Sequence, residues 1–447
     1  MPSTNRSHDS INAEAVHAFR GEIVDFVGDP ATLGNSALRH HPDGVLVVRD
    51  GRIAAAGPAN ATLRTLPRGA AVTDYRGKLI VPGFVDTHVH YAQTDMIASH
   101  GAQLLEWLER YTFPAEARFK DRDHAGEVAE FFVAELLRNG TTTAMTFATT
   151  HKPSVDAIFH AAHRRSMRLV AGKVLADRNV PKAVRDTAQS GYDDSKALIE
   201  AWHGRDRLGY AVTPRFAPTS TERQLDLCGT LLEEHPGVHL QSHVAENRTE
   251  VEWVAALFPW SRSYLDVYDH YGLLCERAVY AHCIHLDTTD RERMAATGAA
   301  MSFCATSNLF LGSGLFDLSA ARSAGVRVGL GTDVGGGTTL SMLRTMAESY
   351  KVCQLAGQTM SPLSAFYLAT LGGAASLYLD GHIGNFDVGK EADFVVLDAA
   401  AMPHLARRID RAETLDERLF AFIILGDDRA VHATHVLGAP VHVRAGV

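Results

Sequence analysis

The chain has 447 residues, and its 43 Lys and Arg against 52 Asp and Glu give a formal net charge of −9 at pH 7. Hydrophobic residues make up 46% of the chain, which is enough for a large buried core and excludes an intrinsically disordered protein. The charges are interspersed and form no basic stripe, so we expect no nucleic-acid partner. At roughly 150 residues per domain, the length suits about three domains, or one large barrel with a smaller unit.

The sequence carries no pattern for secretion or membrane insertion. The first 19 residues lack a basic segment followed by an apolar one. No apolar run reaches the roughly 18 residues of a membrane span. The five cysteines form no CxxC pair and no regular framework: Cys228, Cys275, Cys283, Cys304 and Cys353. We therefore expect a cytoplasmic protein with reduced thiols and no membrane partner.

Both ends of the chain have β character. Residues Gly44–Pro58 form two apolar strand patterns around Asp50-Gly51, a dipeptide favoured in tight hairpin turns. Near the other end, His382–Asp398 and Asp428–Gly446 have a similar pattern of short β segments. We expect the segments from the two ends to pair with each other.

The middle of the chain alternates between apolar strand-like runs and helical patterns. The clearest helical pattern places apolar residues on one face of residues 128–137 and ends at Gly140. Ser220 and Asp287 are the expected N-caps of two further helices. Eight runs have the apolar pattern of buried strands: Gly83–His90, Thr141–Ala148, Leu169–Ala176, Gly209–Phe216, Val238–Val244, Ala278–His282, Ala299–Cys304 and Val326–Asp333.

Eight buried parallel strands with helices between them favour a closed (β/α)₈ TIM barrel in the α/β class. A doubly wound open sheet is the structural alternative, which periodicity alone does not exclude. We predict a barrel domain over residues 81–383 and a small β-sandwich domain built from residues 1–80 and 384–447.

Candidate metal ligands lie where the predicted strands end, which is where a barrel carries its reactive groups. His88 and His90 end the first strand and are two residues apart, so their side chains point the same way. Later strands end in His243, His282 and Asp333. Imidazole nitrogens with a carboxylate form a donor set that suits Zn²⁺ or Fe²⁺.

Glu246 follows His243 by three residues. An acid beside a metal can shuttle protons between water and a substrate nitrogen. The alternative is a solvated glutamate that complements a helix dipole in the first turn. Because Glu246 lies so close to a candidate ligand, we favour the proton shuttle.

Several motifs occur in the order of a known family. PGFVDTHVH (Pro82–His90) resembles the opening metal strand of the amidohydrolase superfamily, and LLEWLERYTFPAE (Leu104–Glu116) is similar to its guanine deaminase family. The resemblance runs from about Gly44 to Asp398. Further matching motifs are TPRFAPT, QSHVAEN, YAHCIHL, TSNLFLGSG and GLGTDVGGG, at residues 213–219, 241–247, 280–286, 306–314 and 329–337.

The resemblance implies a metal-dependent hydrolase with one Zn²⁺ per chain, Fe²⁺ being the alternative, and a homodimer. The metal ligands that it implies are His88, His90, His243 and Asp333. His282 would contact the coordinated water and the substrate, and Glu246 would be the proton shuttle. The fourth strand ends in Thr213–Phe216 without a lysine, which resembles the one-metal branch of the superfamily.

The resemblance also implies a purine substrate held by Gln93, Arg215 and Phe216. The fork of donors on Arg215 suits a ring carbonyl, Gln93 can both donate and accept, and Phe216 offers a stacking face. The implied reaction is hydrolytic deamination of guanine to xanthine and ammonia. In it Asp333 takes the proton of the attacking water, and Glu246 protonates a ring nitrogen.

Two alternatives stay open. A deaminase of another amino-heterocycle, such as 8-oxoguanine, a pterin or a triazine, would share the metal site. A non-catalytic binding protein on the same scaffold would have no need for the complete set of ligands and acids. Trp107 and Tyr111, four residues apart in a helical pattern, form either a lid over the pocket or ordinary packing, and the resemblance of their segment to the family favours the lid. Lys173 is expected to be structural or to support the residues around the site.

Overall fold

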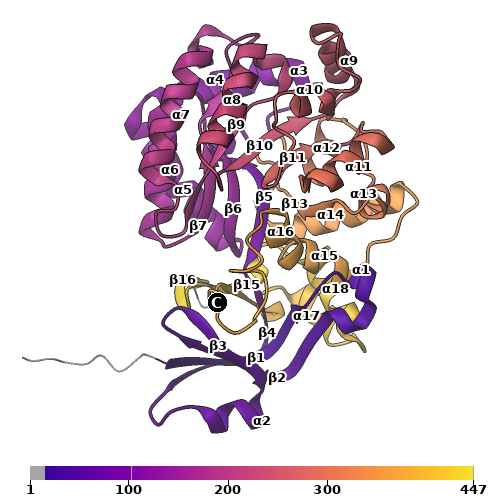
Figure 1. Cartoon of the computed structure of the whole chain (residues 1–447). Helices are drawn as coiled ribbons and strands as arrows, with labels where there is room; N and C mark the ends of the chain where they lie inside the picture. The colour runs from indigo at the N-terminus through magenta and orange to yellow at the C-terminus, as the bar shows by residue number, and fades with distance from the viewer. Residues whose placement is uncertain (1–15, 102, 446–447) are drawn as a thin grey trace, which may run out of the picture.

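The computed structural model describes residues 16–101 and 103–445, which form a barrel with a smaller sheet beside it (Figure 1). The first fifteen residues of the predicted sandwich domain lie outside the described residues. In the part of the chain that is described, no helix is long and apolar enough to cross a membrane. All five cysteines are free, and four of them are buried.

The eight predicted strands are confirmed as one parallel sheet. Neighbours follow the order β5, β6, β7, β9, β10, β11, β12, β13, and the short β8 pairs with β9. Each strand falls within or next to a predicted run: β5 Phe84–His90, β6 Thr141–Phe147, β7 Arg168–Gly172, β8 Val174–Leu175, β9 Leu208–Pro214, β10 His239–Val244, β11 Ala278–His282, β12 Ala300–Phe303 and β13 Arg327–Leu330. The third run is split between β7 and β8.

The first and last strands of this sheet meet and close it into a barrel. The backbone N–H of Asp333 donates to the carbonyl of His88 at 2.8 Å, and that of His90 donates to Val334 at 2.8 Å. The buried Asp86 carboxylate also accepts from the backbone N–H and the hydroxyl of Thr332. These bonds join the segment that carries His88 and His90 to the segment that carries Asp333.

Helices surround the barrel between its strands (Figure 1). The apolar face predicted for residues 128–137 is buried on α5, and Gly140 follows that helix with φ +84°. The barrel region holds these helices: α3 Leu104–Trp107, α4 Phe113–Ala117, α5 Arg122–Arg138, α6 Lys152–Arg164, α7 Ala188–Trp202, α8 Glu222–Glu234, α9 Arg248–Leu257, α10 Tyr264–His270, α11 Thr288–Thr297, α12 Ala305–Phe310, α13 Leu318–Ser323, α14 Met342–Leu355, α15 Pro362–Leu368 and α16 Leu371–Ser376.

One of the two predicted N-caps is correct and the other is wrong by one residue. Asp287 caps α11, where its side chain accepts from the backbone N–H of Asp290. The cap of α8 is Thr221 instead of Ser220, and its hydroxyl accepts from the backbone N–H of Gln224 at 3.2 Å. Ser and Thr are both good caps, so two adjacent hydroxyl residues left the choice open in the sequence.

We expect Thr221→Ala to lower the free energy of unfolding by about 1 kcal/mol, because an N-terminal N–H of α8 loses its partner. Ser220→Ala is the matched control. The Ser220 hydroxyl is buried with no hydrogen-bond partner among the described residues. The free energy of unfolding of Ser220→Ala is therefore expected to lie within about 0.5 kcal/mol of the wild-type value. Urea unfolding measures both, and equal losses for the two variants would contradict the assignment of the cap.

Both chain ends contribute to the smaller sheet, as predicted. Its seven strands follow the order β16, β15, β14, β4, β1, β2, β3. Asp50 and Gly51 form the predicted turn between β2 and β3, both with positive φ. The bounds are β1 Val16–Phe26, β2 Leu38–Arg49, β3 Arg52–Pro58, β4 Ala71–Pro82, β14 Phe394–Leu397, β15 Val431–Val436 and β16 Ala439–Val443, with the short helices α1 Pro30–Leu33 and α2 Ala59–Thr62.

The smaller sheet curls around a core of its own, as the two layers of a small sandwich do. Ile53 of β3 and Ala433 of β15 lie far apart in the strand order, yet both belong to the same buried cluster. At its centre the rings of Phe19 and Phe394 pack edge to face with centroids 4.8 Å apart. A single apolar cluster therefore holds strands from the two ends of the chain together.

Between β14 and β15 the chain leaves this sheet and forms two helices that the sequence reasoning did not predict. They are α17 (Pro403–Ile409) and α18 (Leu415–Leu425). Leu405 and Phe422 on these helices join the core of the barrel, and α18 packs against α14 and α15. The domain boundaries at residues 80/81 and 383/384 stay a prediction.

Candidate active site

A pocket opens where the barrel strands end, as expected of this fold. The empty space within it is about 430 Å³, part of which is open to solvent. All the candidate site residues except His88 line it, and His88 is buried beside them. The lining residues are His90, Gln93, Leu104, Trp107, Leu108, Arg215, Phe216, His243, Glu246, Glu250, His282, Leu311, Asp333 and Gly336.

His88 and three of these side chains, His90, His243 and Asp333, bring nitrogen and oxygen atoms to one point. His90 Nε2 lies 3.2 Å from His88 Nε2 and 3.2 Å from His243 Nε2. Asp333 Oδ1 lies 3.1 Å from His88 Nε2 and 3.3 Å from His90 Nε2. Bonds of about 2.0–2.1 Å place the ligand atoms of a tetrahedral Zn²⁺ about 3.3 Å apart. The spacing and the N₃O donor set both fit one divalent cation.

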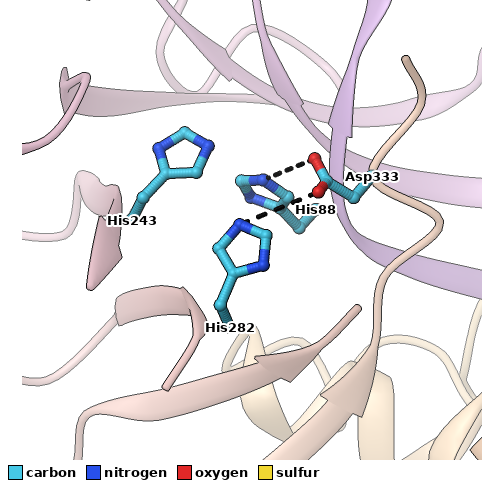
Figure 2. A group of neighbouring side chains, drawn as sticks. All are labelled: His88, His243, His282 and Asp333. Atoms are coloured by element: carbon cyan, nitrogen blue, oxygen red, sulfur yellow. Dashed lines mark ion pairs between the residues drawn. The ribbon is translucent and has the colours of Figure 1, made fainter. Parts of the chain in front are cut away.

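His282 lines the pocket and lies next to the carboxylate of Asp333. Figure 2 shows its ring and that of His88 directed at the two oxygens of Asp333, with His243 facing the same space. His282 Nε2 lies 3.7 Å from Asp333 Oδ2, farther than His88 and His90 lie from Oδ1. His88, His243, His282 and Asp333 place one donor atom each within 4.8 Å of one another.

Hydrogen bonds at the far ring nitrogens orient two of the imidazoles. His243 Nδ1 lies 2.6 Å from the carbonyl oxygen of Arg215, and a carbonyl accepts only, so Nδ1 carries the proton. In the same way His282 Nδ1 lies 2.8 Å from Asn308 Oδ1. Both Nε2 atoms therefore present a lone pair to the cluster, the state that binds metal.

Burial sets the charges of the cluster. Burial lowers the pKa of His90 to about 3 and that of His243 well below its ordinary value. Both rings are therefore neutral, the state in which an imidazole nitrogen can bind a metal. Burial opposes ionisation of Asp333, but His88, His90 and His282 together outweigh it and hold the pKa of Asp333 well below its usual range. In the described part of the chain, His90 Nδ1 is buried without a hydrogen-bond partner.

The backbone is strained at or just beyond the ends of three site strands, β10, β11 and β13. His282 and Asp333 have φ values of +71° and +51°, and Ala245, just before Glu246, has φ +50°. Residues other than glycine seldom adopt this region, and each such residue costs of order 1–3 kcal/mol. The strain turns these side chains into the pocket after their strands have ended.

Glu246 faces the pocket, so the alternative of a solvated first-turn glutamate is wrong. It lies just before Asn247, the N-cap of α9, and is 3% exposed. Its Oε1 accepts from the Ser313 hydroxyl at 3.0 Å, and its Oε2 lies 3.4 Å from His282 Nε2. Burial, reinforced by the charge of Asp333, raises the pKa of Glu246 to about 8.

The two carboxyl groups at the cluster thus differ in protonation near neutral pH. Glu246 holds a proton, whereas Asp333 is ionised. Environments that push two pKa values apart define an acid and a base in one site. This arrangement can move protons to and from a bound ring.

All the candidate site residues lie in a part of the chain that matches one known protein family. The chain matches the amidohydrolase family over residues 79–441, which include every candidate ligand and acid. This chain belongs to the amidohydrolase family.

Within that family the chain groups with guanine deaminases. It is 49% identical over 430 residues to guanine deaminase of Escherichia coli K12, covering 96% of this chain and 98% of that protein. The solved structure of E. coli guanine deaminase superposes with a TM-score of 0.94 over 96% of this chain and 100% of that chain. Guanine deaminase of C. acetobutylicum, solved with guanine bound in its active site, is 29% identical with a TM-score of 0.87, over 96% of this chain and 100% of that chain.

Two of the residues expected to hold a purine line this amidohydrolase pocket and share one hydrogen-bond partner. Arg215 and Gln93 both donate to Glu116, at 2.7 Å and 3.1 Å. Sequence reasoning missed Glu116, although it ends the motif LLEWLERYTFPAE. The signal that could have identified Glu116 is an acidic residue within a motif that is otherwise rich in apolar residues. Phe216 lines the pocket as well, with its ring 6.2 Å from that of Trp253.

Sequence reasoning also missed Ser313 and Asn308, which hold Glu246 and His282. Both lie in TSNLFLGSG, on α12 and the turn after it, and polar residues in such a turn gave no hint of which groups they contact. Lys173 is structural as expected, since its Nζ is buried 2.5 Å from Asp186 Oδ2. Trp107 lines the pocket, while the lid role of Trp107 and Tyr111 stays a prediction.

Proposed function

We propose that this chain hydrolyses guanine to xanthine and ammonia with one divalent cation, Zn²⁺, held in the cluster. The ligands are His88, His90, His243 and Asp333. The observation that carries the proposal is the spacing of 3.1–3.3 Å among their donor atoms, in a chain that groups with guanine deaminases. Fe²⁺ prefers similar donors and is the alternative metal.

A divalent cation held by these four ligands would supply water with a pKa lowered towards about 7. Asp333, ionised beside the three imidazoles, accepts a proton from the attacking water at Oδ2. His282 lies 3.7 Å from that oxygen and 3.4 Å from Glu246 Oε2, so it orients the water between the two acids. The oxygen of water then bonds to the ring carbon that bears the amine.

Glu246 supplies the proton that this attack needs. It gives its proton to the adjacent ring nitrogen, which lets the carbon become tetrahedral. Asp333 then passes its proton to the amine, the C–N bond breaks, and ammonia leaves. The second proton of the water returns to Glu246 as the new carbonyl forms, so both acids end in their starting states.

Arg215, Gln93 and Phe216 hold the ring in place for this chemistry. Arg215 donates to the ring carbonyl, Gln93 bonds the edge of the heterocycle, and Phe216 stacks on its face. Fixing the ring against the cluster turns an encounter into an aligned attack.

The proposal is tested by the release of ammonia from a panel of guanine, adenine, 8-oxoguanine, a pterin and a triazine. Metal analysis of the purified protein is run on the same samples. We expect guanine to have the highest kcat/KM, with xanthine as the product. If another ring had the highest kcat/KM, that ring and not guanine would be the substrate. A metal-loaded protein that is inert to the whole panel would overturn the proposal.

We expect Arg215→Ala to reduce the preference for guanine over adenine by about 10²-fold or more, since the ring carbonyl loses its donor in a buried site. The expected readout is the ratio of kcat/KM for the two purines. Arg223→Ala, on the exposed face of α8, is the control. An unchanged ratio in Arg215→Ala would contradict the assigned role.

The assembly and location that we expected belong to the same proposal. We infer a homodimer from the resemblance to guanine deaminases, and a cytoplasmic location from the five free cysteines. Light scattering of the purified protein measures the assembly, with twice the 48.5 kDa chain mass expected.

A further inference from the structure

A buried carboxylate lies behind the two side chains that meet the ring in the proposed function. Arg215 Nη1 donates to Glu116 Oε1 at 2.9 Å and to Oε2 at 2.7 Å, and Gln93 Nε2 donates to Oε1 at 3.1 Å. Glu116 is 1% exposed and Arg215 is 3% exposed. Glu116 is not among the residues that line the pocket, so it acts on a ligand through its two partners.

Helix α4 holds the guanidinium of Arg215 from two sides. Glu116 and Phe113 both belong to α4, and the guanidinium carbon lies 5.4 Å from the centre of the Phe113 ring. Because Nη1 is engaged by Glu116, the Nη2 and Nε edge is left to donate to a ligand. The guanidinium therefore reaches the pocket in one orientation.

The same contacts fix the amide of Gln93. Its Nε2 faces Glu116, while its Oε1 accepts from the backbone N–H of Gly335 at 3.2 Å. Each end of the amide thus has a partner of the correct kind, and a flipped amide would place two acceptors together. The edge that Gln93 presents to the ring is set by these two neighbours.

Glu116 also balances charge. A lone buried guanidinium would attract anions strongly, because little water screens it. Paired with Glu116, Arg215 keeps its hydrogen-bond donors but adds no net charge to this end of the pocket. Neutral carbonyl rings then bind well, whereas an anionic ring gains no compensating charge from Arg215.

We propose that Glu116 is a positioning residue that makes the pocket select neutral aminated rings over anionic oxo-rings. The inference rests on the proposed function, because the neutral ring is the substrate and the anionic ring is its product. Xanthine has one more ring carbonyl than guanine and loses a ring proton at lower pH. Cancelling the charge of Arg215 therefore favours departure of ionised product.

The test is the affinity of metal-loaded protein for xanthine, measured by calorimetry below and above the pKa of the xanthine ring. In Glu116→Gln, the ratio of anion affinity to neutral affinity is expected to rise about tenfold or more over wild type, because the buried positive charge is no longer cancelled. A ratio within about twofold of wild type would overturn the inference. Ammonia release from guanine by the same wild-type sample tests the proposed function separately, so an unchanged ratio in Glu116→Gln overturns this inference alone.

Two matched variants separate charge from packing. Glu116→Asp keeps the charge and is expected to keep the wild-type ratio. Phe113→Leu loosens the guanidinium without a change of charge, so it is expected to weaken the neutral and anionic forms alike. A raised ratio in Phe113→Leu would assign the effect to mobility of Arg215 and contradict the charge argument.

A double variant covers the case in which Glu116→Gln does not fold. Arg215→Gln with Glu116→Gln leaves no unpaired buried charge, a change that proteins tolerate better than loss of one partner. Because both proteins are neutral at this position, we expect it to have the wild-type ratio of anion to neutral affinity. A ratio about tenfold below wild type would show that a ligand feels the charge of Arg215 in the native pocket, and would overturn the inference.

Discussion

Replacing Glu246 with Gln is expected to lower kcat for guanine by about 10²–10⁴-fold, the usual contribution of a general acid–base group. The amide keeps the shape of the side chain, and its oxygen can still accept from Ser313. It has no proton to give to the ring nitrogen and cannot take one back. The metal ligands are unaltered, so metal content is expected to stay at the wild-type value.

Steady-state kinetics and metal analysis on the same samples test this expectation. The loss is expected in kcat more than in KM, since Glu246 acts on the reacting ring more than on its binding. Glu252→Gln is the matched control: Glu252 lies on the exposed face of α9, and its loss is expected to leave kcat unchanged. Near wild-type turnover by metal-loaded Glu246→Gln would show that another group carries the proton.

Removing His90 is expected to abolish both metal binding and turnover. Its Nε2 lies within 3.3 Å of donor atoms on His88, His243 and Asp333, so it is the ligand that touches all the others. His90→Ala leaves three donors around an open side. The cation supplies several kcal/mol to the reaction, so its loss is expected to lower turnover by at least about 10³-fold.

The matched control for His90→Ala is a histidine outside the pocket. His163 pairs with Asp206 at 3.2 Å on the barrel surface, and His163→Ala is expected to keep both metal and activity. Atomic absorption gives the metal content, and circular dichroism confirms that both variants fold. His90→Ala that retained full metal and turnover would remove His90 from the ligand set.

The fold could be predicted because buried parallel strands leave a plain pattern. Most residues of each barrel strand are buried, and β11 has the predicted bounds, Ala278–His282. The helices α17 and α18 were not predicted, because they interrupt a β segment and bury their apolar faces against the barrel. That burial depends on tertiary contacts, which a local pattern does not carry.

The site was predictable where function depends on position along a strand. His88, His90, His243 and His282 end their strands, and this placement alone predicted that they would meet. Asp333 lies beyond β13, which ends at Leu330, and reaches the cluster through a backbone turn with positive φ. Its role was predictable from the residue type, whereas its geometry was not.

Residues that act through others could not be found in this way. Glu116 contacts Arg215 across 99 positions of sequence, and Ser313 contacts Glu246 across 67. Pairs that far apart leave no periodicity, and an isolated Glu or Ser has many ordinary roles. Only the closed barrel shows which buried groups they hold.

The most direct measurement is a titration of metal-free protein with Zn²⁺, in which guanine turnover and bound metal are followed together. We expect xanthine formation to rise in proportion to bound Zn²⁺ and to level off at one ion per chain, with one ammonia released for each xanthine. Activity that is full before metal is added, or that stays absent with the ion bound, would contradict a single-cation guanine deaminase.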